Sequence, residues 1–225
     1  NRRKNGARVD ITHMSAPNDH GGMAGKMEIK DIVSEISSRA DELLRGRDRM
    51  IIAIDGRCAS GKTTAARALA SAMNKKYGAS IFHMDDFFLR PEQRTEERLA
   101  EPGGNVDRER FLNEVLLPLS RGKAFSYRPF DCSTFSLLAP VKAFPSRVNI
   151  VEGSYCCHPD LFGYYDLRVF MDVSPEVQRQ RIASRDPEKF DAFESKWIPL
   201  EEKYFAAFDV PRKCKMIFDT SLFSF

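Results

Sequence analysis

The chain has 225 residues, of which 42% are hydrophobic and 30% are charged, so it is long enough to bury one core of ordinary size. Its 35 Lys and Arg residues exceed its 32 Asp and Glu residues by only three, and the charges are interspersed, which argues against a nucleic-acid partner. No apolar run approaches the ~20 residues that span a bilayer and the polar N-terminus lacks the apolar stretch of a signal peptide, so we expect a soluble, cytoplasmic protein without a membrane partner.

Residues 1–26 differ from the rest of the chain in composition. They are polar, show no hydrophobic periodicity and do not begin with Met, so we expect a disordered arm or a remnant left by cloning. We place a single domain over residues 27–225. Its first element is an amphipathic helix from Glu28 to about Leu44, where apolar residues recur at helical spacing and predict packing on a sheet.

A phosphate-binding loop (P-loop) is predicted at residues 56–63, which fit the pattern G-x-x-x-x-G-K-[ST]. The context supports it, because Met50–Ile54 has the character of a short buried strand and residues 64–70 favour a helix. In such a loop the backbone N–H groups cradle the β-phosphate, Lys62 reaches the β and γ oxygens, and the Thr63 hydroxyl binds Mg²⁺. We therefore predict ATP and Mg²⁺ as cofactors, held by Gly56, Arg57, Cys58, Ala59, Ser60, Gly61, Lys62, Thr63 and Thr64.

Strands alternate with helices along the rest of the chain. The alternation predicts an α/β fold in which a parallel sheet of about five strands carries helices on both faces. Pro118 is expected to end one helix and Pro199 to interrupt another, and a polar, proline-bearing connection precedes the third strand. The further predicted strands span residues 79–84, 148–151, 167–171 and 215–218, and the further predicted helices span residues 107–117, 174–185 and 190–208.

Acidic residues follow two of the predicted strands. Asp85 and Asp86 come directly after the second strand, so at least one should reach the carboxyl edge of the sheet, where ligands of open α/β folds collect. A carboxylate there can accept the proton of an attacking hydroxyl group, and we favour Asp85 as this catalytic base over a cap of the following turn. Glu152 ends the third strand and would face the P-loop if the two strands are neighbours, which suits a magnesium role beside Thr63.

Basic and aromatic side chains supply further candidates. Arg181 and Arg185 are four residues apart and therefore share a helix face, where guanidinium groups can clamp phosphate oxygens. The alternative is a solvated helix face. Phe87, Phe88 and Phe130 neighbour the predicted chemistry and are the best candidates for stacking on an acceptor.

The five cysteines are an odd number in a chain that needs no disulfide to hold a core, so we expect reduced thiols. Cys156, Cys157, His158 and Cys132 lack the paired C-x-x-C spacing typical of zinc sites. We expect the loop at residues 156–158 to line the acceptor pocket instead.

The motifs occur in an order that resembles the uridine kinase branch of the P-loop kinases, a group that includes phosphoribulokinase and pantothenate kinase. This resemblance implies a P-loop NTPase fold with a small helical lid at about residues 181–208. It also implies an enzyme that transfers phosphate from ATP to a hydroxyl group of a small molecule, with a uridine- or cytidine-like nucleoside as the leading acceptor. It covers about residues 50–220 and rests on the P-loop with Thr63-Thr64, Met84–Phe88, Pro102–Asp107, Val151–Gly153, Phe170–Val173 and Arg181–Asp186.

The same resemblance implies a role for single residues. Asp85 corresponds to the catalytic base, Asp107 to the aspartate that holds the sugar hydroxyls of the acceptor, and Glu152 to the magnesium-associated glutamate. Arg181 and Arg185 correspond to lid arginines that act with Lys62 in catalysis.

Two segments depart from the family pattern. The acceptor segment Arg128–Phe135, in which Arg128 and Phe130 are expected to contact substrate, lacks the His and Arg that recognise a base. Residues 187–191 lack the basic, glycine-containing lid sequence. The alternatives are therefore a kinase for pantothenate or a sugar phosphate, and a nucleotide-binding regulatory module without transfer activity. A homo-oligomer is compatible with either.

Overall fold

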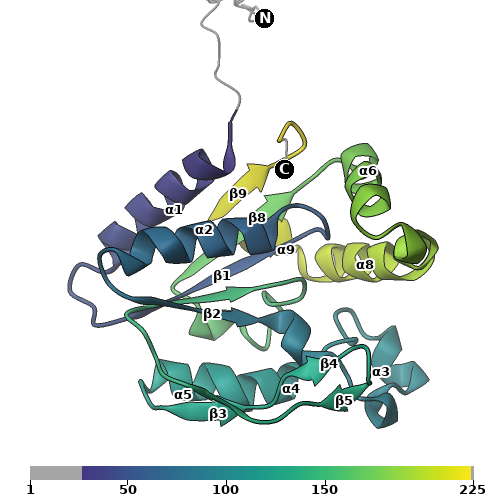
Figure 1. The fold of residues 1–225 in the computed structure, drawn as a ribbon, viewed down its shortest axis with the longest axis horizontal. Helices are drawn as coiled ribbons and strands as arrows, with labels where there is room; N and C mark the ends of the chain where they lie inside the picture. Colours follow the sequence, from purple (N-terminus) through teal and green to yellow (C-terminus); the bar gives the residue numbers. More distant parts are fainter. Residues whose placement is uncertain (1–26, 224–225) are drawn as a thin grey trace, which may run out of the picture.

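A computed structural model of the protein describes residues 27–223, and the arm predicted at residues 1–26 lies outside this part. Its centre is a parallel five-stranded sheet in the order β2-β7-β1-β8-β9, so the predicted α/β fold is confirmed (Figure 1). No helix in the described part is both long and apolar enough to cross a membrane. The strands of this sheet are β1 (Met50–Gly56), β2 (Ala79–His83), β7 (Val148–Glu152), β8 (Leu167–Asp172) and β9 (Met216–Asp219).

One face of the sheet is covered by α1 (Ile29–Leu43) and α2 (Lys62–Asn74), which lie side by side (Figure 1). Alternate residues of a strand point to opposite faces, so Ile52 and Ile54 of β1 join the core beneath these helices. The apolar stripe of α1 buries Ile32, Ile36 and Ala40 in the same core, as the helical spacing predicted.

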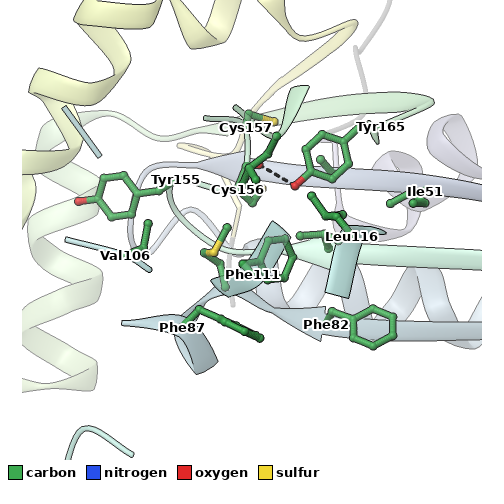
Figure 2. Packing of buried hydrophobic residues seen from close by; sticks show 14 of the residues in the cluster. Ile51, Phe82, Phe87, Val106, Phe111, Leu116, Tyr155, Cys156, Cys157 and Tyr165 are labelled. Atoms are coloured by element: carbon green, nitrogen blue, oxygen red, sulfur yellow. Dashed lines mark hydrogen bonds between the residues drawn. The ribbon is translucent and has the colours of Figure 1, made fainter. Parts of the chain in front are cut away.

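The opposite face carries a second core, in which Ile51 and Ala53 of β1 meet aromatic and sulfur-containing side chains (Figure 2). Cys156 and Cys157 are fully buried here, so they belong to the core and do not line an open pocket as we expected. Burial raises the pKa of Cys156 to about 12, which keeps the thiol neutral. The covering elements are α4 (Arg108–Phe111), η3 (Leu112–Leu116), α5 (Leu117–Ser120), α8 (Ile198–Phe208) and α9 (Val210–Lys213).

The helix predicted to stop at Pro118 continues to Ser120, and this part of the prediction is wrong. The preceding segment η3 is a π-helix, and Pro118 occupies the first turn of α5 that follows it. Inside an α-helix each residue donates its N–H to a carbonyl oxygen four residues earlier, and a proline has no N–H to donate. The hydrogen-bond register changes from π to α next to Pro118, so no donor is needed at this position. The predicted interruption near Pro199 has the same form, because the π-helix η6 (Phe193–Trp197) leads directly into α8.

Several short elements were not revealed by the sequence. In place of an irregular connection the chain forms two small antiparallel pairs, β3 with β6 and β4 with β5. Strands of two or three residues are too short to give a periodic signal. These and the remaining elements are η1 (Met84–Phe87), η2 (Pro91–Gln93), α3 (Glu96–Ala100), β3 (Phe125–Tyr127), β4 (Phe130–Asp131), β5 (Ser136–Leu137), β6 (Val141–Ala143), η4 (Phe162–Tyr164), α6 (Pro175–Arg185), η5 (Pro187–Lys189) and α7 (Phe190–Ala192).

Gly56 offers a test of this packing, because a Cβ atom at this position would lie 2.0 Å from the Met171 carbonyl oxygen of β8 and its φ is +143°. Gly56→Ala should therefore lower the free energy of unfolding by ~3 kcal/mol or more, measured by denaturant unfolding without nucleotide. Gly163→Ala is the matched control, because nothing lies within 4 Å of its added methyl group, and it should be close to neutral. Equal stability of the two variants would contradict the close approach of β1 and β8.

Candidate active site

The P-loop joins β1 to α2 through backbone conformations that turn its amides inward. Ala59 and Gly61 both have positive φ, at 59° and 89°, and α2 begins at Lys62. Successive N–H groups in such a turn form an anion-binding nest that adjoins the N-terminus of a helix. Lys62 is only 9% exposed, and its Nζ donates to the carbonyl oxygens of Gly56 at 2.8 Å and Arg57 at 2.7 Å. Its ammonium group therefore lies across the first half of the loop.

Glu152 lies at the end of β7, and strand register explains its place. Because β7 pairs with both β1 and β2, Glu152 is opposite Ile54 on one side and His83 on the other. The Thr63 hydroxyl lies 3.2 Å from both carboxylate oxygens of Glu152. A hydroxyl and a carboxylate are oxygen donors of the kind that Mg²⁺ prefers, so these two residues fit the predicted metal role.

His83, the last residue of β2, also belongs to this group. Its Nδ1 lies 2.5 Å from Glu152 Oε1. This hydrogen bond is the main reason why the pKa of His83 is raised, and the nearby carboxylates Asp86 and Asp85 add to the effect. His83 therefore fixes one oxygen of Glu152 from the side opposite Thr63.

Asp85 and Asp86 lie in η1, the turn that follows β2, but they have different surroundings. The carboxylate of Asp85 is open to solvent on one side, yet enough protein surrounds it that lost hydration is the main cause of its raised pKa. The charge of Glu152 raises this pKa further and that of Lys62 lowers it, so Asp85 lies on the P-loop side of the edge. The carboxylate of Asp86 is bonded to Tyr127, which leaves Asp85 as the better base candidate.

Asp107 is buried beside this turn and is the N-cap of α4. One carboxylate oxygen accepts from the Arg110 N–H at 3.1 Å, and the other accepts from Gln93 Nε2 at 2.8 Å. Its own N–H donates to the Phe87 carbonyl at 2.7 Å, which ties its loop to η1. The structure therefore brings Asp107 next to the Asp85 turn and gives its carboxylate a fixed orientation.

The other acceptor candidates are less free than the sequence indicated. Arg128 donates to the carbonyl oxygens of Leu137 and Leu138 at 2.7 Å, so it braces the β4–β5 hairpin. Phe130 is buried, whereas Phe88 is half-buried and pairs through its backbone with Val106. Phe88 thus keeps more surface for an acceptor than Phe130 does.

The two arginines predicted to belong to a lid, Arg181 and Arg185, have separate environments, although both lie on α6. Arg181 donates to the Ala59 carbonyl at 3.1 Å and to the Thr220 carbonyl at 2.5 Å, so it braces the outside of the P-loop. Arg185 is bonded to Asp186 at 2.6 Å and lies over the ring of Phe193. A shared role of this pair on phosphate oxygens stays a prediction.

Two buried carboxylates of the site were missed by the sequence analysis. The sequence does carry a signal for Asp55, because it is the one charged residue in an otherwise apolar strand, directly before Gly56. Glu201 has none, since it lies among the aromatic residues of a helix far along the chain. Its carboxylate accepts from the N–H of Cys58 in the P-loop at 2.9 Å.

Asp55 is fully buried at the end of β1 and accepts three hydrogen bonds. The donors are the N–H of Gly56 at 2.7 Å, the N–H of Cys157 at 2.8 Å and the Tyr204 hydroxyl at 2.8 Å. Burial raises its pKa to about 6, although the three hydrogen bonds act in the opposite direction. Asp55 is thus a buried carboxylate whose three hydrogen-bond donors include no cation, and it holds the start of the P-loop in place.

A parallel sheet with a phosphate loop after its central strand defines a P-loop nucleotide-binding protein. This chain belongs to the phosphoribulokinase / uridine kinase family, whose pattern matches residues 51–189. It is 30% identical over 185 residues to a "Putative uridine kinase" of Schizosaccharomyces pombe, covering 72% of this chain and 78% of that protein. The chain is therefore a kinase of this family, and the family implies the use of ATP and Mg²⁺.

Solved structures show the same fold. A "Possible Uridine Kinase" from Bacillus stearothermophilus superposes with a TM-score of 0.59 at 21% identity, over 82% of this chain and 100% of that one. A D-glycerate 3-kinase from Cryptococcus neoformans superposes with a TM-score of 0.54 at 12% identity, over 77% of this chain and 87% of that one. At these identities the likeness concerns the fold alone.

The raised pKa of Asp55 predicts a pH dependence of stability. Its folded pKa of about 6 lies above the ordinary value of 3.8, so this residue stabilises the fold fully below pH 3.8 and loses that contribution as the pH rises through 6. Between pH 4 and 7 the wild type should therefore lose up to ~3 kcal/mol relative to Asp55→Asn, which cannot titrate. Parallel pH profiles of the two proteins in denaturant unfolding would contradict the raised pKa.

Proposed function

We propose that this kinase transfers the γ-phosphoryl group of Mg·ATP to a hydroxyl group of a small molecule, with a uridine- or cytidine-like nucleoside as the leading acceptor. The observation that carries the proposal is the position of Asp85 on the P-loop side of the sheet edge, within the electrostatic reach of Lys62 and Glu152. A P-loop alone would serve any nucleotide-binding protein. A carboxylate beside it gives the acceptor hydroxyl a place to leave its proton.

Each residue of the site has a distinct task in this proposal. The P-loop amides and Lys62 bind the triphosphate and orient its terminal group. Thr63 and Glu152 would hold Mg²⁺, which when bound neutralises charge on the phosphate oxygens. His83 keeps the Glu152 carboxylate in place through its 2.5 Å hydrogen bond. Asp85 takes the proton of the acceptor hydroxyl, and Asp107 positions the acceptor beside it.

The leading acceptor class rests on similarity and on the fixed orientation of the Asp107 carboxylate. The relative from Schizosaccharomyces pombe is named as a uridine kinase. Asp107 is held rigidly by Gln93 and the Arg110 N–H, and the remaining lone pairs of its oxygens can accept hydrogen bonds from vicinal hydroxyls of a sugar. A nucleoside offers such hydroxyls together with a base that can stack on Phe88.

One observation favours a second candidate, a sugar phosphate. The exposed guanidinium of Arg94 lies 5.2 Å from the Phe135 ring centroid and 5.9 Å from that of Phe130. Both rings belong to the acceptor segment Arg128–Phe135, so Arg94 lies beside that segment. An arginine held in this way can bind an anionic group of the acceptor. The sequence alternatives of pantothenate and of a regulatory module without transfer activity are separated by the same assays.

Asp85→Asn tests the catalytic base. The amide cannot accept the proton, so turnover should fall ~10²–10⁴-fold while the Kd for Mg·ATP changes little. Asp86→Asn is the matched control, because that carboxylate is bonded to Tyr127 and should contribute little to turnover. Turnover is followed as acceptor-dependent ADP release and binding by calorimetry. Near-normal turnover in Asp85→Asn would remove this residue from the role of base.

An acceptor panel tests the substrate class. We expect uridine or cytidine to give the highest kcat/KM for ADP release among nucleosides, pantothenate, ribose 5-phosphate and other phosphosugars. A clear preference for a phosphosugar, lost in Arg94→Ala, would favour the second candidate. Binding of Mg·ATP without stimulation by any acceptor would instead indicate a regulatory module.

A further inference from the structure

Glu201 is a buried carboxylate in the active site to which the proposed reaction gives no task. It lies on α8 and is 4% exposed. Its Oε2 accepts from the Cys58 N–H at 2.9 Å, and its Oε1 accepts from the Ser154 hydroxyl at 2.5 Å. The same hydroxyl lies 3.3 Å from the Gly56 carbonyl oxygen. Glu201 and Ser154 together therefore hold both ends of the first turn of the P-loop.

Neighbouring side chains of α8 contact the same part of the loop. The Tyr204 hydroxyl donates to Asp55, and Glu202 forms an ion pair with Arg57. The Arg57 guanidinium also lies 5.6 Å from the Phe205 ring centroid. Residues at spacings of three and four share a helix face, so one side of α8 is fitted to residues 55–58.

Among these contacts, the bond from Cys58 to Glu201 is the one made to a loop amide. Hydrogen bonds to a charged acceptor are the stronger kind, and a buried N–H left without a partner is costly. The Cys58 N–H belongs to the peptide that joins Arg57 to Cys58, one residue before Ala59, whose φ of +59° begins the inward turn of the loop. The Glu201 carboxylate therefore holds the peptide that leads into the curvature on which the phosphate cradle depends.

We propose that Glu201 is a positioning residue of the P-loop, which prepares the loop for Mg·ATP by accepting the hydrogen bond from Cys58. The feature that matters is an acceptor oxygen at this place, not a proton transfer and not the filling of space. The inference concerns nucleotide binding and needs no assumption about the acceptor or about Asp85. It adds a residue from the C-terminal part of the chain to a site built from strands β1, β2 and β7.

The test compares three variants by their Kd for Mg·ATP, measured by calorimetry without an acceptor. Glu201→Ala removes the oxygen and should weaken binding ~10–100-fold. Glu201→Gln keeps an oxygen for the Cys58 N–H and should restore the Kd to within ~3-fold of the wild type. Glu194→Ala is the matched control, because it removes a carboxylate of the same region whose partner is Arg179 on the surface. This control should bind Mg·ATP like the wild type.

Two outcomes would overturn the proposal. Unchanged affinity in Glu201→Ala would show that the carboxylate only fills space, and equal loss in Glu201→Gln and Glu201→Ala would show that the acceptor oxygen is not what matters. If Glu201→Ala does not fold, Ser154→Ala replaces it, because it releases Oε1 of Glu201 and should weaken binding ~3–10-fold. Unchanged affinity in that variant would also reject the proposal.

The same measurement keeps this inference separate from the proposed transfer reaction. A wild-type protein that binds Mg·ATP but phosphorylates no acceptor would contradict the proposed function. The Kd values of the Glu201 variants would still test the role of Glu201. A wild-type protein that does not bind Mg·ATP would reject both.

Discussion

The parallel pairing of β7 with both β1 and β2 decides where the chemistry of this protein lies. In that register the last residue of β7, Glu152, comes between the P-loop that follows β1 and His83 at the end of β2. A shift of one residue would turn the Glu152 side chain to the other face of the sheet, away from Thr63. The contact of Thr63 with Glu152, the turn with Asp85 and the loop of Asp107 tied to that turn all follow from this one alignment.

The site gathers negative charge around a single buried cation. Asp55, Glu152 and Glu201 are buried, Asp85 lies beside them, and Lys62 is the buried cation of the P-loop. Isolated charges are costly to bury, and here each buried carboxylate accepts at least two hydrogen bonds or contacts from named donors. The excess of carboxylates also favours the uptake of a divalent cation with the triphosphate, which is the form in which kinases use ATP.

The strands, the P-loop and the proximity of Thr63 to Glu152 could be predicted from the sequence because each has a local signal. Apolar runs mark the strands, glycine spacing marks the loop, and a carboxylate at a strand end marks the edge.

Glu201 and His83 could not be found in this way. Glu201 meets Cys58 across 143 residues of sequence. His83 lies inside a predicted strand, and only the strand order shows that Glu152 lies beside it. Arg181 and Arg185 share a helix face as predicted, but the partners of each are set by tertiary contacts that a spacing of four does not encode.

The π-helix η6 ahead of Pro199 has a consequence for the far end of the site. A π-turn accommodates one residue more than the α-helix of the same length, and each residue of an α-helix advances its direction by about 100°. Without the extra residue, everything after Trp197 would be rotated by roughly that angle. Glu201 and Tyr204 would then point away from residues 55–58. The irregular turn therefore sets the rotation of α8 about its axis, and the face that α8 presents to the nucleotide loop depends on the number of residues in the preceding segment.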